Sequence, residues 1–164
     1  MKNWSLVETV MKVKKDRMES IKCKKVTTAV LASFSILGGT MIYILFRPTH
    51  LLMFNWIDSI GMLAFVNSIR PVSWNVSEWV VYSLPDALWM FSYCLFIGCV
   101  WDFDLKKCLF VLTILPIYAV SNEIMQYFHI TSGTFDWMDL FAFLMAFVLG
   151  VLFLSYNKVK SKTK

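Results

Sequence analysis

Long apolar segments separated by short polar ones dominate the pattern along the chain. Residues 26–46 form an apolar run of 21 residues, interrupted only by Ser, Thr and the pair Gly38-Gly39. Three further apolar segments cover residues 84–101, 108–129 and 134–156. A helix needs about 20 mostly apolar residues to cross the hydrocarbon core of a bilayer, which is about 30 Å thick. The pattern therefore predicts four transmembrane helices at these positions.

The second of these segments opens on a typical helix start, Ser83-Leu84-Pro85-Asp86. Ser83 can cap the helix, and Pro85 is tolerated in a first turn because its missing N–H would be unpaired there in any case. Asp86 follows the cap by three residues and can accept a hydrogen bond from a free backbone N–H. The helix is therefore predicted to begin at Ser83, and capping alone is sufficient to explain Asp86.

The segment between the first two spans, residues 50–69, is apolar but interrupted by Asn55, Asp58, Ser59, Asn67 and Ser68. Stretches of about ten residues on either side of Asp58 are too short to cross a bilayer. We predict two short helices that lie in the outer interface or dip partly into it. A complete extra span is the alternative, and it would place the C-terminal lysines on the outer side.

The two ends of the chain are basic. Residues 1–25 carry eight Lys or Arg residues, and Trp4, Val7, Met11, Met18 and Ile21 recur there at helical spacing. This pattern fits either an amphipathic helix on the cytoplasmic leaflet or a frayed basic tail. The C-terminal residues 157–164 are also basic, and we expect them to be a disordered cytoplasmic tail.

Composition and charge define the class and the orientation. The chain is 58% hydrophobic and 16% charged, against roughly 25% charged in soluble domains, and its mean hydropathy is +0.61. With four spans, the side that holds both termini has 14 basic and 5 acidic residues, whereas the other side has 2 basic and 6 acidic residues. The excess of Lys and Arg favours cytoplasmic termini and contact with anionic lipids. We therefore predict an all-α polytopic membrane protein, a four-helix bundle at residues 26–156, and no nucleic-acid partner.

The polar stretch 121–139 interrupts this apolar pattern at the predicted outer end of the last two spans. Glu123 and Gln126 are three residues apart and share a helix face, as do Asp136 and Asp139. The short turn between them makes their helices antiparallel neighbours, and Asp86 lies at the same level. These five side chains are therefore predicted to converge in one outward-facing pocket.

Each pocket candidate also has a structural explanation. Asp86 and Asp136 can serve only as first-turn carboxylates, and Gln126 can bond across helices. His129, at the predicted helix end, is more typical of a structural residue than of a ligand. Capping explains neither Glu123 nor Asp139, and ionisable groups at membrane depth are typical of functional sites. The function prediction depends mainly on those two.

Several kinds of chemistry remain open for such a pocket. Crowded carboxyl groups cannot all ionise cheaply, which suits a general acid, a proton carrier or the recognition of a cationic or hydrogen-bonding ligand. A divalent cation is another way to neutralise them, although we predict no metal and no cofactor. The four cysteines form no CxxC pair. The sequence contains no Ser/His/Asp arrangement, phosphate loop or HEXXH motif, so no catalytic residue is assigned and an enzyme is not favoured.

The stretch 121–150 resembles the VanZ-like family of small bacterial membrane proteins. The family pattern is Glu-x-x-Gln, a short turn, Phe-Asp-x-x-Asp and a later Gly, which correspond here to Glu123, Gln126, Phe135, Asp136, Asp139 and Gly150. The chain departs from the pattern at three positions, with Phe143 for Asn, Ala146 for Gly and Gly133 for a basic residue.

The resemblance implies a multi-pass protein of the bacterial cytoplasmic membrane with a role in the cell envelope, as in teicoplanin resistance. Its pocket would bind an envelope lipid, a lipid-linked precursor or an amphipathic glycopeptide. The alternatives are a membrane enzyme that acts on lipid head groups through carboxylic acids protonated near neutral pH, and a non-catalytic partner of another membrane protein. In the last case the apolar faces at Ala142 and Ala146 would matter more than the acids.

Overall fold

The computed structural model describes residues 2–70, 76–131 and 133–162, without the side chains of 2–6, 17 and 159–162. The described residues form helices, turns and loops and no strand, which confirms the predicted all-α class. In chain order the helices are α1 (Lys2–Phe46), α2 (Leu52–Ser59), α3 (Leu63–Ile69), α4 (Glu78–Val100), α5 (Leu105–Tyr127) and α6 (Trp137–Lys162).

Four of these helices are long and apolar enough to cross a membrane: α1, α4, α5 and α6. They correspond to the four predicted spans. The predicted pair of short helices is also present, because α2 and α3 meet at an angle of 118° after a short break. By length and composition alone, that bent pair could also count as a fifth, broken span.

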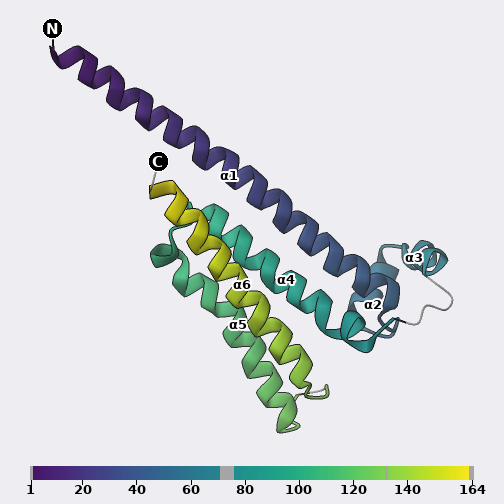
Figure 1. The fold of residues 1–164 in the computed structure, drawn as a ribbon. Helices are drawn as coiled ribbons and strands as arrows, with labels where there is room; N and C mark the ends of the chain where they lie inside the picture. Colours follow the sequence, from purple (N-terminus) through teal and green to yellow (C-terminus); the bar gives the residue numbers. More distant parts are fainter. Residues whose placement is uncertain (1, 71–75, 132, 163–164) are drawn as a thin grey trace.

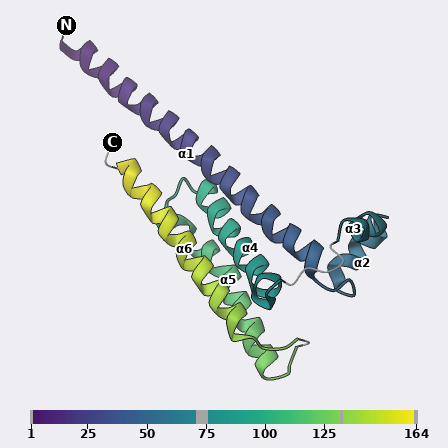
Figure 2. The same cartoon turned by 45° about the vertical axis from the view of Figure 1, so that its right-hand side comes forward.

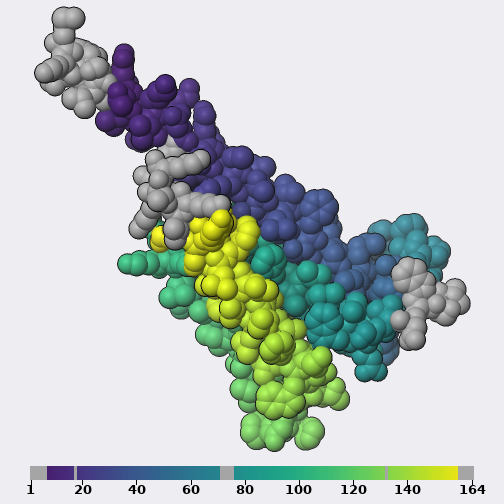
Figure 3. Space-filling model, viewed as in Figure 1, coloured from purple at the N-terminus to yellow at the C-terminus, as the bar shows by residue number. Residues whose placement is uncertain are grey.

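Helix α1 does not stop between residues 25 and 26. It continues as one helix of 45 residues, because its first 36 residues contain no Gly or Pro to interrupt it. Its N-terminal part extends beyond the other helices (Figures 1–3). For residues 157–162 the prediction of a disordered tail was likewise wrong, since α6 continues to Lys162; residues 163–164 lie outside the described residues.

Helix α4 begins at Glu78 and not at Ser83. The carbonyl of Ser77 accepts hydrogen bonds from Val80 and Val81 at 2.9 and 3.3 Å, which starts the helix one and a half turns earlier than predicted. Ser83 and Pro85 are therefore buried inside the helix. The predicted capping role of Asp86 was wrong for the same reason, because Asp86 lies more than two turns from the start.

Helix α4 lies between α1 and α6 and packs against both (Figures 1 and 2). Ser92 donates a hydrogen bond of 2.9 Å to the carbonyl of Ala32 in α1. On the other side, Gly98 and Gly150 allow α4 and α6 to approach closely, against Leu154 and Cys94 respectively. Helix α5 packs less extensively against this pair, and it runs antiparallel to α6, as the short connection predicted (Figure 1).

Ion pairs join the helices at the end of the bundle that contains the α4–α5 turn. Lys25 of α1 lies 2.5 Å from Asp102, and Lys158 of α6 donates a hydrogen bond of 2.7 Å to Asp104. Ion pairs thus link the α4–α5 turn to both α1 and α6. This hydrogen bond from Lys158 lowers the pKa of the Asp104 carboxyl from its usual value.

The lowered pKa of Asp104 predicts a pH-dependent contribution to stability. A carboxyl whose pKa is lower in the folded state stabilises the fold fully above its unfolded pKa, about 4, and the contribution is lost as the pH falls through the folded value. The unfolding temperature of wild type should therefore exceed that of Asp104→Asn by a constant amount between pH 7 and 5. The difference should shrink toward pH 3, as measured by thermal unfolding in detergent. A difference that persists unchanged at pH 3 would contradict this origin.

Candidate functional site

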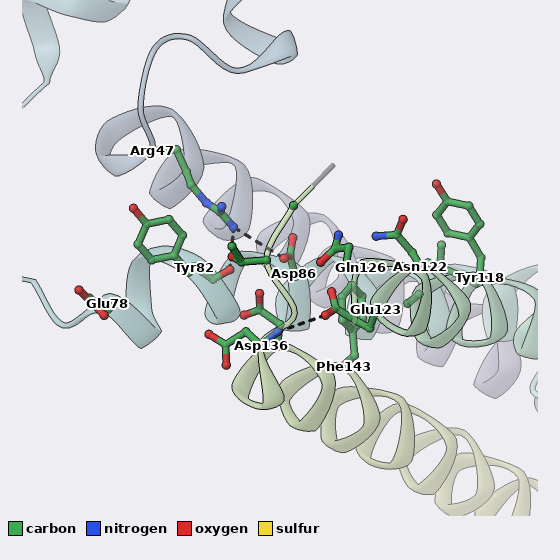
Figure 4. A pocket seen from close by; sticks show the side chains of 15 residues that line it. Arg47, Glu78, Tyr82, Asp86, Tyr118, Asn122, Glu123, Gln126, Asp136 and Phe143 are labelled. Atoms are coloured by element: carbon green, nitrogen blue, oxygen red, sulfur yellow. Dashed lines mark hydrogen bonds and ion pairs between the residues drawn. The ribbon is translucent and has the colours of Figure 1, made fainter. Parts of the chain in front are cut away.

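A cavity of about 680 Å³ opens at the end of the bundle away from the α4–α5 turn, and Figure 4 shows the side chains that line it. It lies between α4, α5 and the start of α6, with the C-terminal end of α1 at its edge. The structure brings all five predicted pocket residues to its lining: Asp86, Glu123, Gln126, Asp136 and Asp139. Three elements distant in the sequence therefore contribute polar groups to one space.

Glu123 is the least exposed of the pocket carboxylates, with 7% of the residue exposed. Its side chain points into the cavity (Figure 4). One carboxylate oxygen, Oε2, accepts a hydrogen bond of 3.4 Å from the backbone N–H of Asp136. This bond connects α5 to the residue that precedes α6. Glu123 therefore also helps to hold together the hairpin that α5, α6 and the turn between them form at the cavity.

Asp139 is paired with a residue that the sequence suggested only as a helix cap. The hydroxyl of Ser83 donates a hydrogen bond of 2.6 Å to Oδ1 of Asp139. Ser83 is 1% exposed, and the early start of α4 is what directs it toward α6. The capping role predicted for Ser83 was therefore wrong, and its actual role is to position the Asp139 carboxylate.

Asp136 has the structural role that was considered for it. It directly precedes α6, and its Oδ1 accepts a hydrogen bond of 2.8 Å from the N–H of Met138. A side-chain oxygen in this position satisfies one of the free N–H groups of the first turn. Asp136 is thus a helix cap that also lines the cavity.

Replacing Asp136 should separate these two roles. Asn caps helices about as well as Asp, whereas Ala does not, at a cost of about 1 kcal/mol. We expect Asp136→Ala to lower the free energy of unfolding by about this amount and Asp136→Asn to leave it close to wild type, as measured by unfolding in detergent. An equal loss in both variants would mean that the charge, and not the cap, stabilises α6.

Asp86 is paired with Arg47, the residue that directly follows α1. The guanidinium Nη2 of Arg47 lies 3.8 Å from Oδ2 of Asp86 and donates a hydrogen bond of 2.8 Å to the carbonyl of Tyr82. The Arg47 guanidinium also lies over the rings of Tyr43 and Tyr82, at 5.3 and 4.6 Å from their centroids. Arg47 is one of only two basic residues on the predicted outer side of the sequence, and this was the only sequence signal for the pair.

A second arginine fixes the end of α1 that carries Arg47. Arg70 follows α3 and donates hydrogen bonds of 3.0 Å to the carbonyl of Ile44 and 2.6 Å to that of Arg47. These carbonyls belong to the last turn of α1 and its end, where helical partners are missing. Arg70, at the end of the α2–α3 segment, therefore caps α1 and helps to fix the edge of the cavity at Arg47.

Two candidates at the hairpin differ in their placement. Gln126 lines the cavity and lies so close to Gly133 that a Cβ there would come within 2.8 Å of the Gln126 amide carbon. His129 is exposed, adopts a left-handed backbone conformation with φ of 56° and is not part of the lining. The sequence did not single out four of the other lining residues, Glu78, Tyr82, Tyr118 and Phe143, as pocket residues.

The cavity lining is strongly acidic. It contains five carboxylates, from Glu78, Asp86, Glu123, Asp136 and Asp139, against one guanidinium, from Arg47. Within the described residues, no group of three or more His, Cys, Asp or Glu side chains is arranged so that it could hold a metal ion. The arrangement is suited to binding through charge and hydrogen bonds.

The remaining residues of the VanZ-like pattern lie outside the cavity. Phe135 packs edge-on against Tyr127 and Trp137, with centroid distances of 5.5 and 4.9 Å. Gly150 lies against Cys94 in the α4–α6 contact. In the comparisons with known proteins, no family model, no curated protein and no solved structure matches the chain.

Proposed function

We propose that this chain is a VanZ-like protein of the bacterial cytoplasmic membrane whose acidic cavity binds an amphipathic molecule of the cell envelope. The candidate ligands are an envelope lipid, a lipid-linked precursor and a glycopeptide of the teicoplanin type. The observation that carries the proposal is the convergence of Asp86, Glu123 and Asp139 on one cavity from three different helices. Carboxylates at the level of membrane helices are costly, and function is the usual reason for their presence.

The shape of the lining supports an amphipathic ligand. The polar groups gather at the hairpin end, whereas Leu115, Tyr118 and Ala119 of α5 continue the lining away from it. From Gln126 to Leu115 the lining extends along α5 for eleven positions, or about 16 Å at 1.5 Å per residue. A ligand with a polar head and an apolar part would contact both regions.

The distribution of charge supports an outward-facing cavity. Both termini and the α4–α5 turn, which Lys106 and Lys107 of α5 follow closely in the sequence, lie at one end of the bundle, and the acidic cavity lies at the other (Figure 1). Basic residues favour the cytoplasmic side, which would place the cavity, with α2 and α3 beside it, at the outer surface. The two short helices would then lie in the outer interface.

Susceptibility of cells that produce the protein tests the proposal. We expect wild type to raise the minimal inhibitory concentration of a teicoplanin-type glycopeptide, and Glu123→Gln or Asp139→Asn to abolish the increase at an unchanged protein level. Asp58→Asn is the matched control, because Asp58 is an exposed acid of α2 outside the cavity.

The orientation is tested in the same cells, in a background without the native cysteines. A membrane-impermeant thiol reagent should label Ile130→Cys, at an exposed position between α5 and α6, in intact cells and Ser161→Cys only after lysis. Full resistance in both cavity variants would contradict the site, and the reverse labelling would contradict the orientation.

A further inference from the structure

Acidic side chains outnumber basic ones in the described lining of the cavity. Of the six charged side chains in the lining, five are carboxylates. Arg47 is the only cation among the lining residues that the structure describes. Its guanidinium is already engaged by Asp86, by the carbonyl of Tyr82 and by two aromatic rings, although its buried Nε has no hydrogen-bond partner. Its positive charge is therefore directed at the α1–α4 edge of the cavity and not at α5.

Two of the remaining carboxylates have neutral donors of their own. Asp139 accepts from Ser83, and Asp136 accepts from the N–H of Met138. Glu123 is different, because Oε2 accepts one long bond of 3.4 Å and Oε1 has no hydrogen-bond partner among the described residues. A glutamate that is more than nine-tenths buried thus presents an unpaired oxygen to the cavity (Figure 4).

The Oε1 oxygen of Glu123 is accessible from the cavity and has no donor among the described residues, so a ligand that supplies an N–H group or a positive charge can pair with it. An ammonium group offers three N–H donors and a compact charge, so it can contact several carboxylates at once. An anionic head group would instead meet like charges in a space of low dielectric constant. The electrostatics of the lining therefore select for a cation.

The apolar part of the lining adds a second requirement. Tyr118 lines the cavity but is 66% exposed, on a helix that is long and apolar enough to cross a membrane. Leu115 and Phe143 lie in the same lining. An alkyl chain that extends from the acidic end would thus contact an apolar surface along α5 that is exposed on the outside of the bundle.

We infer that the cavity binds the ammonium head group of an amphiphile next to Glu123, with the alkyl part of the same molecule along Leu115 and Tyr118. This inference rests on the proposed function and specifies its ligand class. The amine can belong to a membrane lipid or to an amphipathic antibiotic, because both present the same chemistry to the carboxylates.

Calorimetric titration of the full chain in phosphatidylcholine nanodiscs tests the inference, with empty discs as the reference. The probes share one alkyl chain and differ in the head group: dodecylamine, N-dodecylacetamide and dodecyl phosphate. We expect saturable binding of dodecylamine only, weakened at least about tenfold in Glu123→Gln. The control variant Asp58→Asn should bind as wild type does.

The source of the amine is distinguished by competition. Displacement of dodecylamine by phosphatidylethanolamine in the disc assigns the site to a lipid, and displacement by an amine-bearing glycopeptide added from water assigns it to an antibiotic. Either result supports the inference.

Absence of saturable dodecylamine binding, or equal binding in wild type and Glu123→Gln, would overturn the inference. Dodecyl phosphate bound by wild type and lost in Glu123→Gln would overturn the cation preference but leave an amphiphile site in this cavity. The proposed function is decided separately by the susceptibility of cells, so the two can fail independently.

Discussion

Gly150→Ala is expected to lower the free energy of unfolding by about 2–3 kcal/mol, although alanine is the smallest possible addition. A Cβ at this position would lie 2.5 Å from Cβ of Cys94 and 3.0 Å from its Sγ. The Cβ of Cys94 is attached directly to the backbone of α4 and cannot rotate away, and Cys94 is fully buried. The two helices must therefore separate locally, which loosens a close contact between α4 and α6.

Gly38→Ala is the matched control for this prediction. It makes the same change inside a membrane helix, but a Cβ at position 38 would meet only Cδ1 of Leu88, at an ordinary distance of 3.8 Å. Because alanine favours helix over glycine by about 1 kcal/mol, this control should be neutral or slightly stabilising. Unfolding by SDS in mixed micelles measures both variants. Equal stability of the two would show that the α4–α6 contact does not limit the fold.

The same substitution should also affect the cavity. Helices α4 and α6 carry Ser83 and Asp139, whose hydrogen bond crosses the contact between these helices about three turns from Gly150. Separation of the helices would lengthen that bond and leave the Asp139 carboxylate without its donor. This gives Gly150, a member of the VanZ-like pattern, a packing role that its sequence position did not indicate.

The apolar pattern predicted the spanning helices well because length and hydrophobicity are local properties. Helices α5 and α6 begin within three residues of their predicted starts, at Leu105 and Trp137. The start of α4 was missed because Ser83 and Pro85 form a plausible helix start wherever they occur, and only the hydrogen bonds of the Ser77 carbonyl show that the helix is already established. The residues from Ser83 to Asp86 match the sequence pattern of a helix start, but in this chain they lie inside a helix that has already begun.

The polar residues of the cavity were predictable to the extent that the topology brings them together. Glu123 and Asp139 were singled out because capping could not explain them, and the antiparallel turn brings their helices side by side. The partners of Asp86 and Asp139 were not predictable, because Arg47 and Ser83 are 39 and 56 positions away in the sequence. Contacts at that separation depend on how helices rotate about their axes, which the hydrophobic pattern alone does not determine.

Arg47→Met is expected to lower the free energy of unfolding by about 2–3 kcal/mol, the second large effect. The variant keeps an apolar stem but removes the ion pair with Asp86, the hydrogen bond to the Tyr82 carbonyl and two ring contacts. Breaking a fully buried ion pair by removing one partner costs about 3–5 kcal/mol. The smaller value follows because the side chains of Arg47 and Asp86 remain 17% and 22% exposed and their separation of 3.8 Å is long.

A double-mutant cycle separates the charge from the other Arg47 contacts. Asp86→Asn alone should cost less than Arg47→Met, because Arg47 keeps the Tyr82 carbonyl and both rings. Once Asp86 is neutral, the loss caused by Arg47→Met should fall, since no uncompensated carboxylate remains at the cavity edge. Unfolding in detergent of wild type, both single variants and the double variant gives the coupling energy. Strict additivity would mean that Arg47 stabilises α4 through the carbonyl and the rings alone, and that Asp86 is available to a ligand without first giving up a partner.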